Sequence, residues 1–233
     1  MLATAAAAFF ALTATGVPAH AAGPVAPSPP RELTSCPHSP PEEPAELVTY
    51  SGVAADAAIA FEHPSAWTVN EDFTDVGGTA TVLGENGAPI ASLGVFLTWG
   101  AVCGPDCTLP PVLHLEDLPG DEPLSNSGDF VVRTVSMDLT GSPELREAYE
   151  WSDNVRVVTS LTDAEVPVPT EMLPFVMYGV GLIETGVLAP NEIYYRPVIF
   201  SSTRDFATLE EAKDYASSVE HRQVQEMIAS FRG

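Results

Sequence analysis

The chain has 233 residues, of which 45% are hydrophobic and 8% aromatic, so it can bury the core of one domain and is not disordered throughout. Its 32 Asp and Glu residues outnumber its 9 Lys and Arg residues and give a net charge of −23. Because such a surface repels phosphate backbones and anionic membranes, nucleic-acid binding is not expected, whereas cationic partners and divalent cations remain compatible.

The first 21 residues are predicted to be a secretory signal peptide. An apolar, uncharged run at residues 5–12 is followed by a glycine and a proline that break a helix. Residues 19–21 then read Ala-His-Ala, the small-x-small pattern that a signal peptidase recognises, so cleavage is expected after Ala21. No Lys or Arg precedes the apolar run, which departs from a typical signal. The mature protein is expected to be secreted or associated with the cell envelope.

A proline-rich spacer is predicted between the signal peptide and the folded part. Residues 22–46 contain eight prolines, a composition that forms extended chain rather than a packed core. Residues 33–36 (Leu-Thr-Ser-Cys) look like a lipobox, but the apolar run does not lead directly into them, so lipid attachment at Cys36 is not the favoured interpretation. A single domain is expected over residues 47–233.

The first half of that domain has strand and hairpin signals. Short extended segments are expected at residues 59–62 and 67–69, on either side of a turn, with Trp67 in the core. Residues 79–83 and 90–98 are apolar runs on either side of Glu85-Asn86-Gly87. Asn-Gly between two apolar runs is the strongest short-range signal of a β-hairpin.

Residues 101–130 are rich in Pro, Gly and acidic side chains and are interpreted as an insertion. Cys103-Gly104-Pro105-Asp106-Cys107 lies within it, and a Gly-Pro turn can bring the two sulfurs together. In an oxidising compartment a disulfide between Cys103 and Cys107 is therefore expected, with Cys36 left as the odd cysteine. The alternative is a metal site formed by both cysteines and His114.

The second half continues with strands and ends in helices. Strands are predicted at residues 130–139, 149–151, 155–161, 175–183 and 193–201. The most apolar remaining stretch, residues 173–190, contains a glutamate, an internal proline and three glycines. It falls short of the ~20 apolar residues of a membrane span, so no span is predicted.

Two capping-box patterns predict helices near the C-terminus. Thr208-Leu209-Glu210-Glu211 precedes the first, and Ser217-Ser218-Val219-Glu220 precedes the second. The second helix has an apolar stripe that should pack on the sheet, and His221 on this helix is expected to be exposed. The stripe consists of Val224, Met227, Ile228 and Phe231.

The order of elements and two local motifs resemble the PsbP-like superfamily, whose members include exported proteins of Gram-positive bacteria. One motif is Phe61-Glu62-His63-Pro64-Ser65-Ala66-Trp67, similar to the family's aromatic-x-x-Pro-x-x-Trp opening, and the other is the ending Met227-Ile228-Ala229-Ser230-Phe231. The resemblance implies an α+β class, an antiparallel β-sheet with packed helices in a PsbP-like sandwich. It also implies partner binding rather than catalysis.

Candidate chemistry outside the cysteines is sparse. Acidic residues at 116–129, and Asp72 with Asp75, could bind calcium, although neither group has the alternating spacing of a calcium loop. No nucleophile elbow or His-Glu-x-x-His pair is present. A hydrolase site would therefore have to be assembled from distant segments around His63 or His114.

The expected function is that of an exported, non-catalytic binding protein whose partner at the cell exterior is a protein or a small ligand. No cofactor, metal or catalytic residue is assigned. A secreted hydrolase with an unrecognised site and a calcium-dependent binding module are the alternatives.

Overall fold

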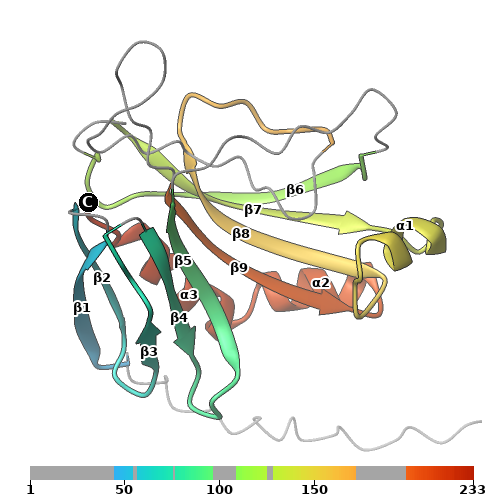
Figure 1. The fold of residues 1–233 in the computed structure, drawn as a ribbon. Helices are drawn as coiled ribbons and strands as arrows, with labels where there is room; N and C mark the ends of the chain where they lie inside the picture. Colours follow the sequence, from blue (N-terminus) through green and yellow to red (C-terminus); the bar gives the residue numbers. More distant parts are fainter. Residues whose placement is uncertain (1–44, 55–56, 76, 97–108, 125–127, 172–197) are drawn as a thin grey trace, which may run out of the picture. The chain divides into compact units, whose positions relative to one another are not determined.

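Nine β-strands and three helices make up the part of the chain that the computed structural model describes, residues 45–54, 57–75, 77–96, 109–124, 128–171 and 198–233 (Figure 1). The strands are β1 (Leu47–Ala54), β2 (Ala57–Pro64), β3 (Thr68–Glu71), β4 (Gly77–Leu83), β5 (Pro89–Phe96), β6 (Val112–Pro119), β7 (Phe130–Asp138), β8 (Val155–Asp163) and β9 (Val198–Phe206). The helices are α1 (Pro143–Ala148), α2 (Leu209–Ala216) and α3 (Val219–Ala229).

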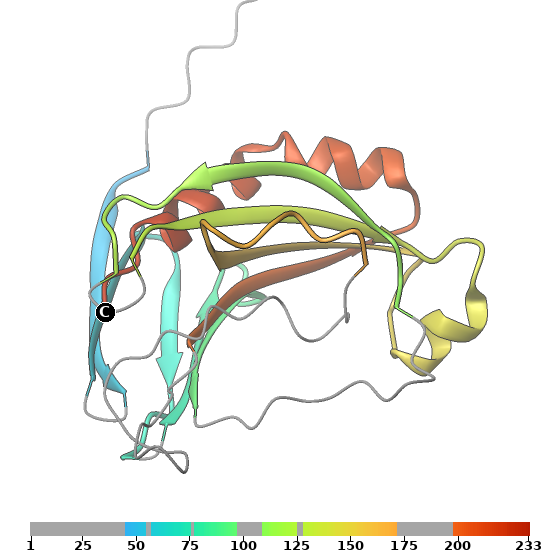
Figure 2. The same cartoon turned by 90° about the horizontal axis from the view of Figure 1, so that it is seen from above.

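The strands form two antiparallel sheets. β1 and β2 make a hairpin, and the other seven strands form one sheet in the order β3-β4-β5-β9-β8-β7-β6. The chain crosses from one side of this sheet to the other between β5 and β6, and β9 later enters the middle of the sheet. Figure 2 shows that the sheet is curved and that α2 and α3 lie on its convex side.

The predicted β-hairpin formed, whereas one of the predicted strands did not. β4 and β5 pair as predicted, and Gly87 in their turn has a φ of 76°, a left-handed conformation that favours glycine. The strand expected at residues 149–151 does not form, because the chain there leaves α1 and turns. β8 pairs instead with β7 and β9.

The main apolar core lies between the β1–β2 hairpin, α3 and the large sheet. It includes Phe61 from the hairpin, Phe200 from the sheet and Phe231 after α3, which are each at most 1% exposed. Trp67, at 8% exposed, also belongs to it, as expected. After α3 the chain pairs with β2 through hydrogen bonds between Ala60 and Arg232, which ties the C-terminus to the hairpin.

The α+β class expected from the sequence is wrong. The described part is mainly β-sheet, and its helices have only 6, 8 and 11 residues. Packed helices were expected to cover the apolar residues of the sheet. Many of these residues are instead covered by the β1–β2 hairpin together with α3. Residues 101–130, which were expected to be an insertion, also contain β6, an edge strand of the large sheet.

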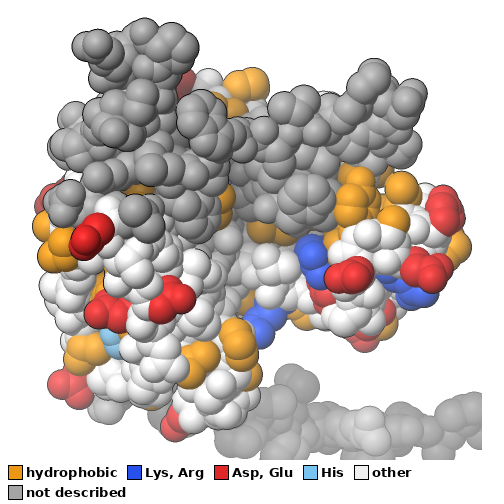
Figure 3. Space-filling view, viewed as in Figure 1, with side chains coloured by type: hydrophobic (Ala, Val, Ile, Leu, Met, Phe, Trp, Pro, Cys, Tyr) orange, Lys and Arg blue, Asp and Glu red, His pale blue; other side chains and the backbone are white. Residues whose placement is uncertain are grey.

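The helices of the described ranges are too short and too polar to cross a membrane. On the face shown in Figure 3, acidic side chains are spread over the end with β1–β4 and the end with α1, with a few basic side chains between them. The predicted signal peptide, spacer and disulfide pair Cys103–Cys107, and the strand expected at residues 175–183, lie outside the described residues.

Candidate functional site

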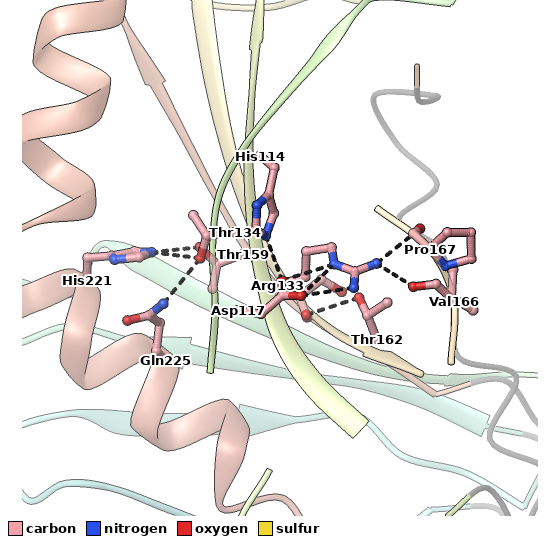
Figure 4. Close-up of polar contacts among 11 residues, drawn as sticks. His114, Asp117, Arg133, Thr134, Thr159, Thr162, Val166, Pro167, His221 and Gln225 are labelled. Carbon is pink, nitrogen blue, oxygen red and sulfur yellow. Dashed lines mark hydrogen bonds and ion pairs between the residues drawn. The ribbon is translucent and has the colours of Figure 1, made fainter. Parts of the chain in front are cut away.

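The N-terminal half of α3 carries a buried histidine that bonds to two strands. His221 is 0% exposed, and its Nε2 atom lies 2.9 Å from the hydroxyl of Thr159 and 3.3 Å from the hydroxyl of Thr134 (Figure 4). Its Nδ1 atom lies 2.9 Å from the carbonyl oxygen of Ala216. Because a carbonyl can only accept, Nδ1 carries the proton, and Nε2 of the neutral ring accepts from the threonine hydroxyls.

The surroundings of His221 favour its neutral form. Burial lowers its pKa below the usual 6.5, and the positive charge of Arg222 acts in the same direction. The hydrogen bond to Ala216 and the charge of Glu116 act in the opposite direction but do not reverse the shift. At neutral pH, His221 is therefore an uncharged part of the interior, linking α3 to β7 and β8.

Gln225 extends this polar contact by one helical turn. Gln225 is 5% exposed, and its Nε2 atom donates to the hydroxyl of Thr134 at 3.3 Å. Thr134 and Thr159 are directly paired across β7 and β8, and their hydroxyls lie 3.2 Å apart. Two strands and one helix thus share a single hydrogen-bonded cluster.

A second polar cluster lies on the opposite face of the same strands. Arg133 precedes Thr134 on β7 and points away from the helices, because successive side chains of a strand alternate between faces. Its guanidinium donates to Asp117 at 3.0 Å through both Nε and Nη2, and to the carbonyl of Val166 at 3.0 Å. His114 Nε2 lies 3.0 Å from the same carboxylate.

This arrangement has a clear effect on Asp117. Burial raises the pKa of its carboxyl, but the hydrogen bonds and charges of Arg133 and His114 outweigh burial and bring the pKa below 3.8. The carboxylate is consequently held in its charged form by a bidentate arginine, an arrangement stronger than an ordinary neutral hydrogen bond. The contacts fix β6 against β7.

A β-bulge in β6 determines which side chains of this strand face each of the two clusters. The register between β6 and β7 shifts between His114 and Glu116, so that Leu115 is an additional residue. Leu115 packs against the apolar residues under α2, and Glu116 Oε1 lies 3.5 Å from His221 Nδ1. Glu116 therefore lies on the helix side, while Asp117 lies on the other.

A pocket of about 510 Å³ lies where β6 meets the end of α2 and the start of α3. Residues 113–116 of β6 line it on one side, and the helices contribute Lys213, Ser217, Arg222 and Gln225. The polar cluster of His221 lies directly beside it, through Gln225 and Glu116. The volume falls in the range of small-molecule sites, whereas the mostly polar lining differs from the apolar lining that most of these sites have.

The pocket contains residue types found in hydrolases, but their hydrogen bonds are used elsewhere. The hydroxyl of Ser218 accepts from the backbone N–H of His221 and so caps α3, and that of Ser217 donates to the carbonyl of Lys213. His114 bonds to Asp117 rather than to either serine. Among the described contacts, neither serine hydroxyl of the pocket is therefore bonded to a histidine side chain.

The remaining candidate residues are placed by local structure. His63, 6% exposed, has its Nδ1 atom 2.9 Å from the carbonyl of Pro64, the last residue of β2. The carboxylate of Asp72 accepts from the backbone N–H and hydroxyl of Thr79, which lowers its pKa. Glu116 and Asp117 point to opposite faces, and the described ranges contain no group of three metal-binding side chains.

Sequence reasoning missed the main residues of this site. His221 was expected to be exposed and is fully buried, and Gln225, Thr134 and Thr159 were not singled out. One signal was available: His221 and Gln225 are four residues apart, on the same face of α3 as part of the apolar stripe. Nothing in the sequence showed that the strand facing them would present hydroxyl groups.

No protein-family model, no curated protein and no solved structure matches this chain. The resemblance to the PsbP-like superfamily accordingly stays a prediction from two short motifs and the predicted order of elements.

Proposed function

We propose that this chain is a non-catalytic binding protein of the cell exterior and that the pocket between β6 and helices α2 and α3 is its ligand site. The observation that carries the proposal is the pocket itself, which has a volume of about 510 Å³ and a wall supported by buried, hydrogen-bonded polar residues. Sites that bind small molecules are generally preformed hollows with a few fixed polar groups.

The way in which the polar residues are supported favours binding at this position. Gln225 is held by Thr134, and Glu116 is set on the helix side by the bulge in β6. A side chain held as that of Gln225 is loses little conformational freedom when a ligand binds. The location at the cell exterior rests on the signal peptide predicted from the sequence.

The direct test is a screen of water-soluble fragments, followed through the backbone amide signals of ¹⁵N-labelled protein. Hits are expected to shift the signals of residues 113–116 and 213–225. A Ser217→Trp variant, which fills the pocket from an exposed position, should abolish these shifts, whereas Ser92→Trp on distant β5 should not. Absence of hits, or hits that are insensitive to Ser217→Trp, would contradict the proposal.

The hydrolase alternative is separated by an activity assay. Turnover of an ester, peptide or glycoside panel by purified protein would replace the binding proposal if His114→Ala or Ser217→Ala abolished it. Calcium-dependent binding predicts instead that calcium raises the melting temperature. The geometry does not favour a calcium site here, because Glu116 and Asp117 point to opposite faces of the sheet.

A further inference from the structure

Two basic side chains of the pocket differ from the other Lys and Arg residues of the described part. The other described arginines each donate to a side-chain oxygen of a described residue; they are Arg133, Arg146, Arg156, Arg204 and Arg232. Lys213, the chain's only lysine, and Arg222 have no such partner among the described residues, and both line the pocket. In a chain of net charge −23, two cations without a partner in the described part form a local exception at this pocket.

The same pocket contains a carboxylate that does not pair with them. Glu116 lines it, and its described contact is with His221 Nδ1, at 3.5 Å, rather than with Lys213 or Arg222. The ring proton on Nδ1 is already donated to Ala216, so Glu116 can still accept a hydrogen bond from a ligand. The pocket therefore has positive and negative side chains that remain apart.

Gln225 adds a further group of fixed orientation. Its amide nitrogen is bonded to Thr134, so its carbonyl oxygen points away from the threonines, as Figure 4 shows. No described residue donates to that oxygen, and Gln225, although 5% exposed, lines the pocket. An accessible acceptor of fixed orientation at a pocket wall suits a ligand that brings a hydrogen-bond donor.

We infer that the ligand is a small dipolar molecule, with an anionic group held by Lys213 and Arg222 and an ammonium group held by Glu116 and Gln225. The inference rests on the proposed function, because it names the ligand class of the same pocket. It follows from charge complementarity: a ligand with one charge would satisfy the cations or the acceptors, whereas a ligand with both satisfies all of them.

Matched probes test each half of the inference. The probes are the ω-amino acids from β-alanine to 5-aminopentanoate, each compared by NMR titration with the acid and the amine of the same length. The best amino acid is expected to bind about tenfold more tightly than either single-charge compound, the ratio given by one additional charged hydrogen bond. Equal affinity of the amino acid and its acid would overturn the inference.

Charge-removing variants assign the two ends. Lys213→Gln with Arg222→Gln should weaken the amino acid and the acid about tenfold and leave the amine unchanged. Glu116→Gln should weaken the amino acid and the amine and leave the acid unchanged or tighter. Arg232→Gln, an exposed cation outside the pocket lining, is the matched control and should change none of the affinities.

The two proposals fail in different ways. If none of the amino acids binds, but fragments bind at a site that Ser217→Trp closes, the dipolar ligand class is wrong and the binding function stands. If Ser217→Trp affects no ligand, both proposals are wrong. Unchanged affinities in Glu116→Gln overturn the ligand class alone.

Discussion

The side chains that α3 packs against the rest of the protein form an apolar half and a polar half, which interleave along the helix and make their contacts by different physical means. The apolar half consists of Val224, Met227 and Ile228, which pack into the apolar core next to Phe231 and are each at most 1% exposed. The polar half consists of His221 and Gln225, which pack onto threonine hydroxyls of the sheet. One half is held by contacts that have no preferred direction, the other by contacts that require particular partners.

The difference shows where a binding site can be built in a small β-protein. An apolar contact can be rearranged at moderate cost if the volume is kept, but it offers a polar ligand nothing to bond. A buried polar contact has a fixed geometry because leaving a group unpaired is unfavourable. In this chain the pocket lies beside the polar half, where Gln225 belongs both to the interior and to the lining.

The largest effect should come from truncation in the apolar core into which the apolar half of α3 packs. Phe231→Ala removes a ring that is 1% exposed and leaves a cavity among Phe200 and the hairpin. The free energy of unfolding should fall by about 3–5 kcal/mol, and Trp67→Ala should have a similar effect. Urea denaturation followed by circular dichroism measures it. A loss below about 1 kcal/mol, typical of surface sites, would contradict the placement of Phe231 in the core.

Disrupting the polar half should have a smaller effect that depends on the partner. His221→Phe keeps a ring of similar size but leaves Thr159 and the carbonyl of Ala216 without their bonds, so a loss of about 2–3 kcal/mol is expected. Adding Thr159→Val should recover part of it, because removing both partners is less unfavourable than removing one. Strict additivity of the two changes in a double-mutant cycle would contradict the described contact.

The pH dependence of stability should separate the two halves. Burial lowers the pKa of His221 in the folded chain, so the unfolded chain binds a proton more readily. Stability is then fully present above the ordinary pKa of about 6.5 and is lost as the pH falls below it. His221→Phe should remove this loss from a series of denaturation curves between neutral and mildly acidic pH.

Control measurements sharpen the same comparison. Phe231→Ala should retain the pH slope that His221→Phe lacks. Asp117 and Asp205, whose pKa values lie below 3.8, lose their contribution only at more acidic pH, outside this window. An unchanged slope in His221→Phe would mean that His221 is not the group that titrates.

The smallest predicted effect lies outside both halves, at the start of α2. Thr208 and Glu211 form a capping box, in which the threonine hydroxyl accepts from the N–H of Glu211 and the glutamate side chain accepts from the N–H of Thr208. Thr208→Ala should lower the free energy of unfolding by about 1 kcal/mol, measured in the same denaturation assay. A loss as large as that of Phe231→Ala would show that α2 is more than a peripheral helix.

The elements that could be predicted have strong local patterns. The β4–β5 hairpin was signalled by Asn86-Gly87, α2 by its capping box, and the apolar half of α3 by the spacing of Val224, Met227 and Ile228. In these segments the sequence pattern and the tertiary contacts favour the same structure, which makes local reasoning sufficient.

The elements that were missed depend on contacts distant in sequence. β6 was not predicted because it lies in an acidic, proline-rich stretch without a strong apolar pattern. As an edge strand of the sheet it needs few apolar residues. His221 looked like a surface residue, since a histidine on a helix becomes buried only where a facing strand supplies partners, here Thr134 and Thr159. The pocket could not be predicted because it arises from β6 and α3 together.

If the polar half of α3 forms one wall of a ligand site, a bound ligand must change the surroundings of Gln225. The direct measurement is a ¹H–¹⁵N spectrum of the labelled chain, recorded with and without the best-binding ω-amino acid and including the side-chain amide of Gln225. Shifts are predicted for that amide and for the backbone of residues 113–116 and 213–225. A spectrum in which the Gln225 amide stays unchanged while signals of the β1–β2 hairpin shift would contradict the claim.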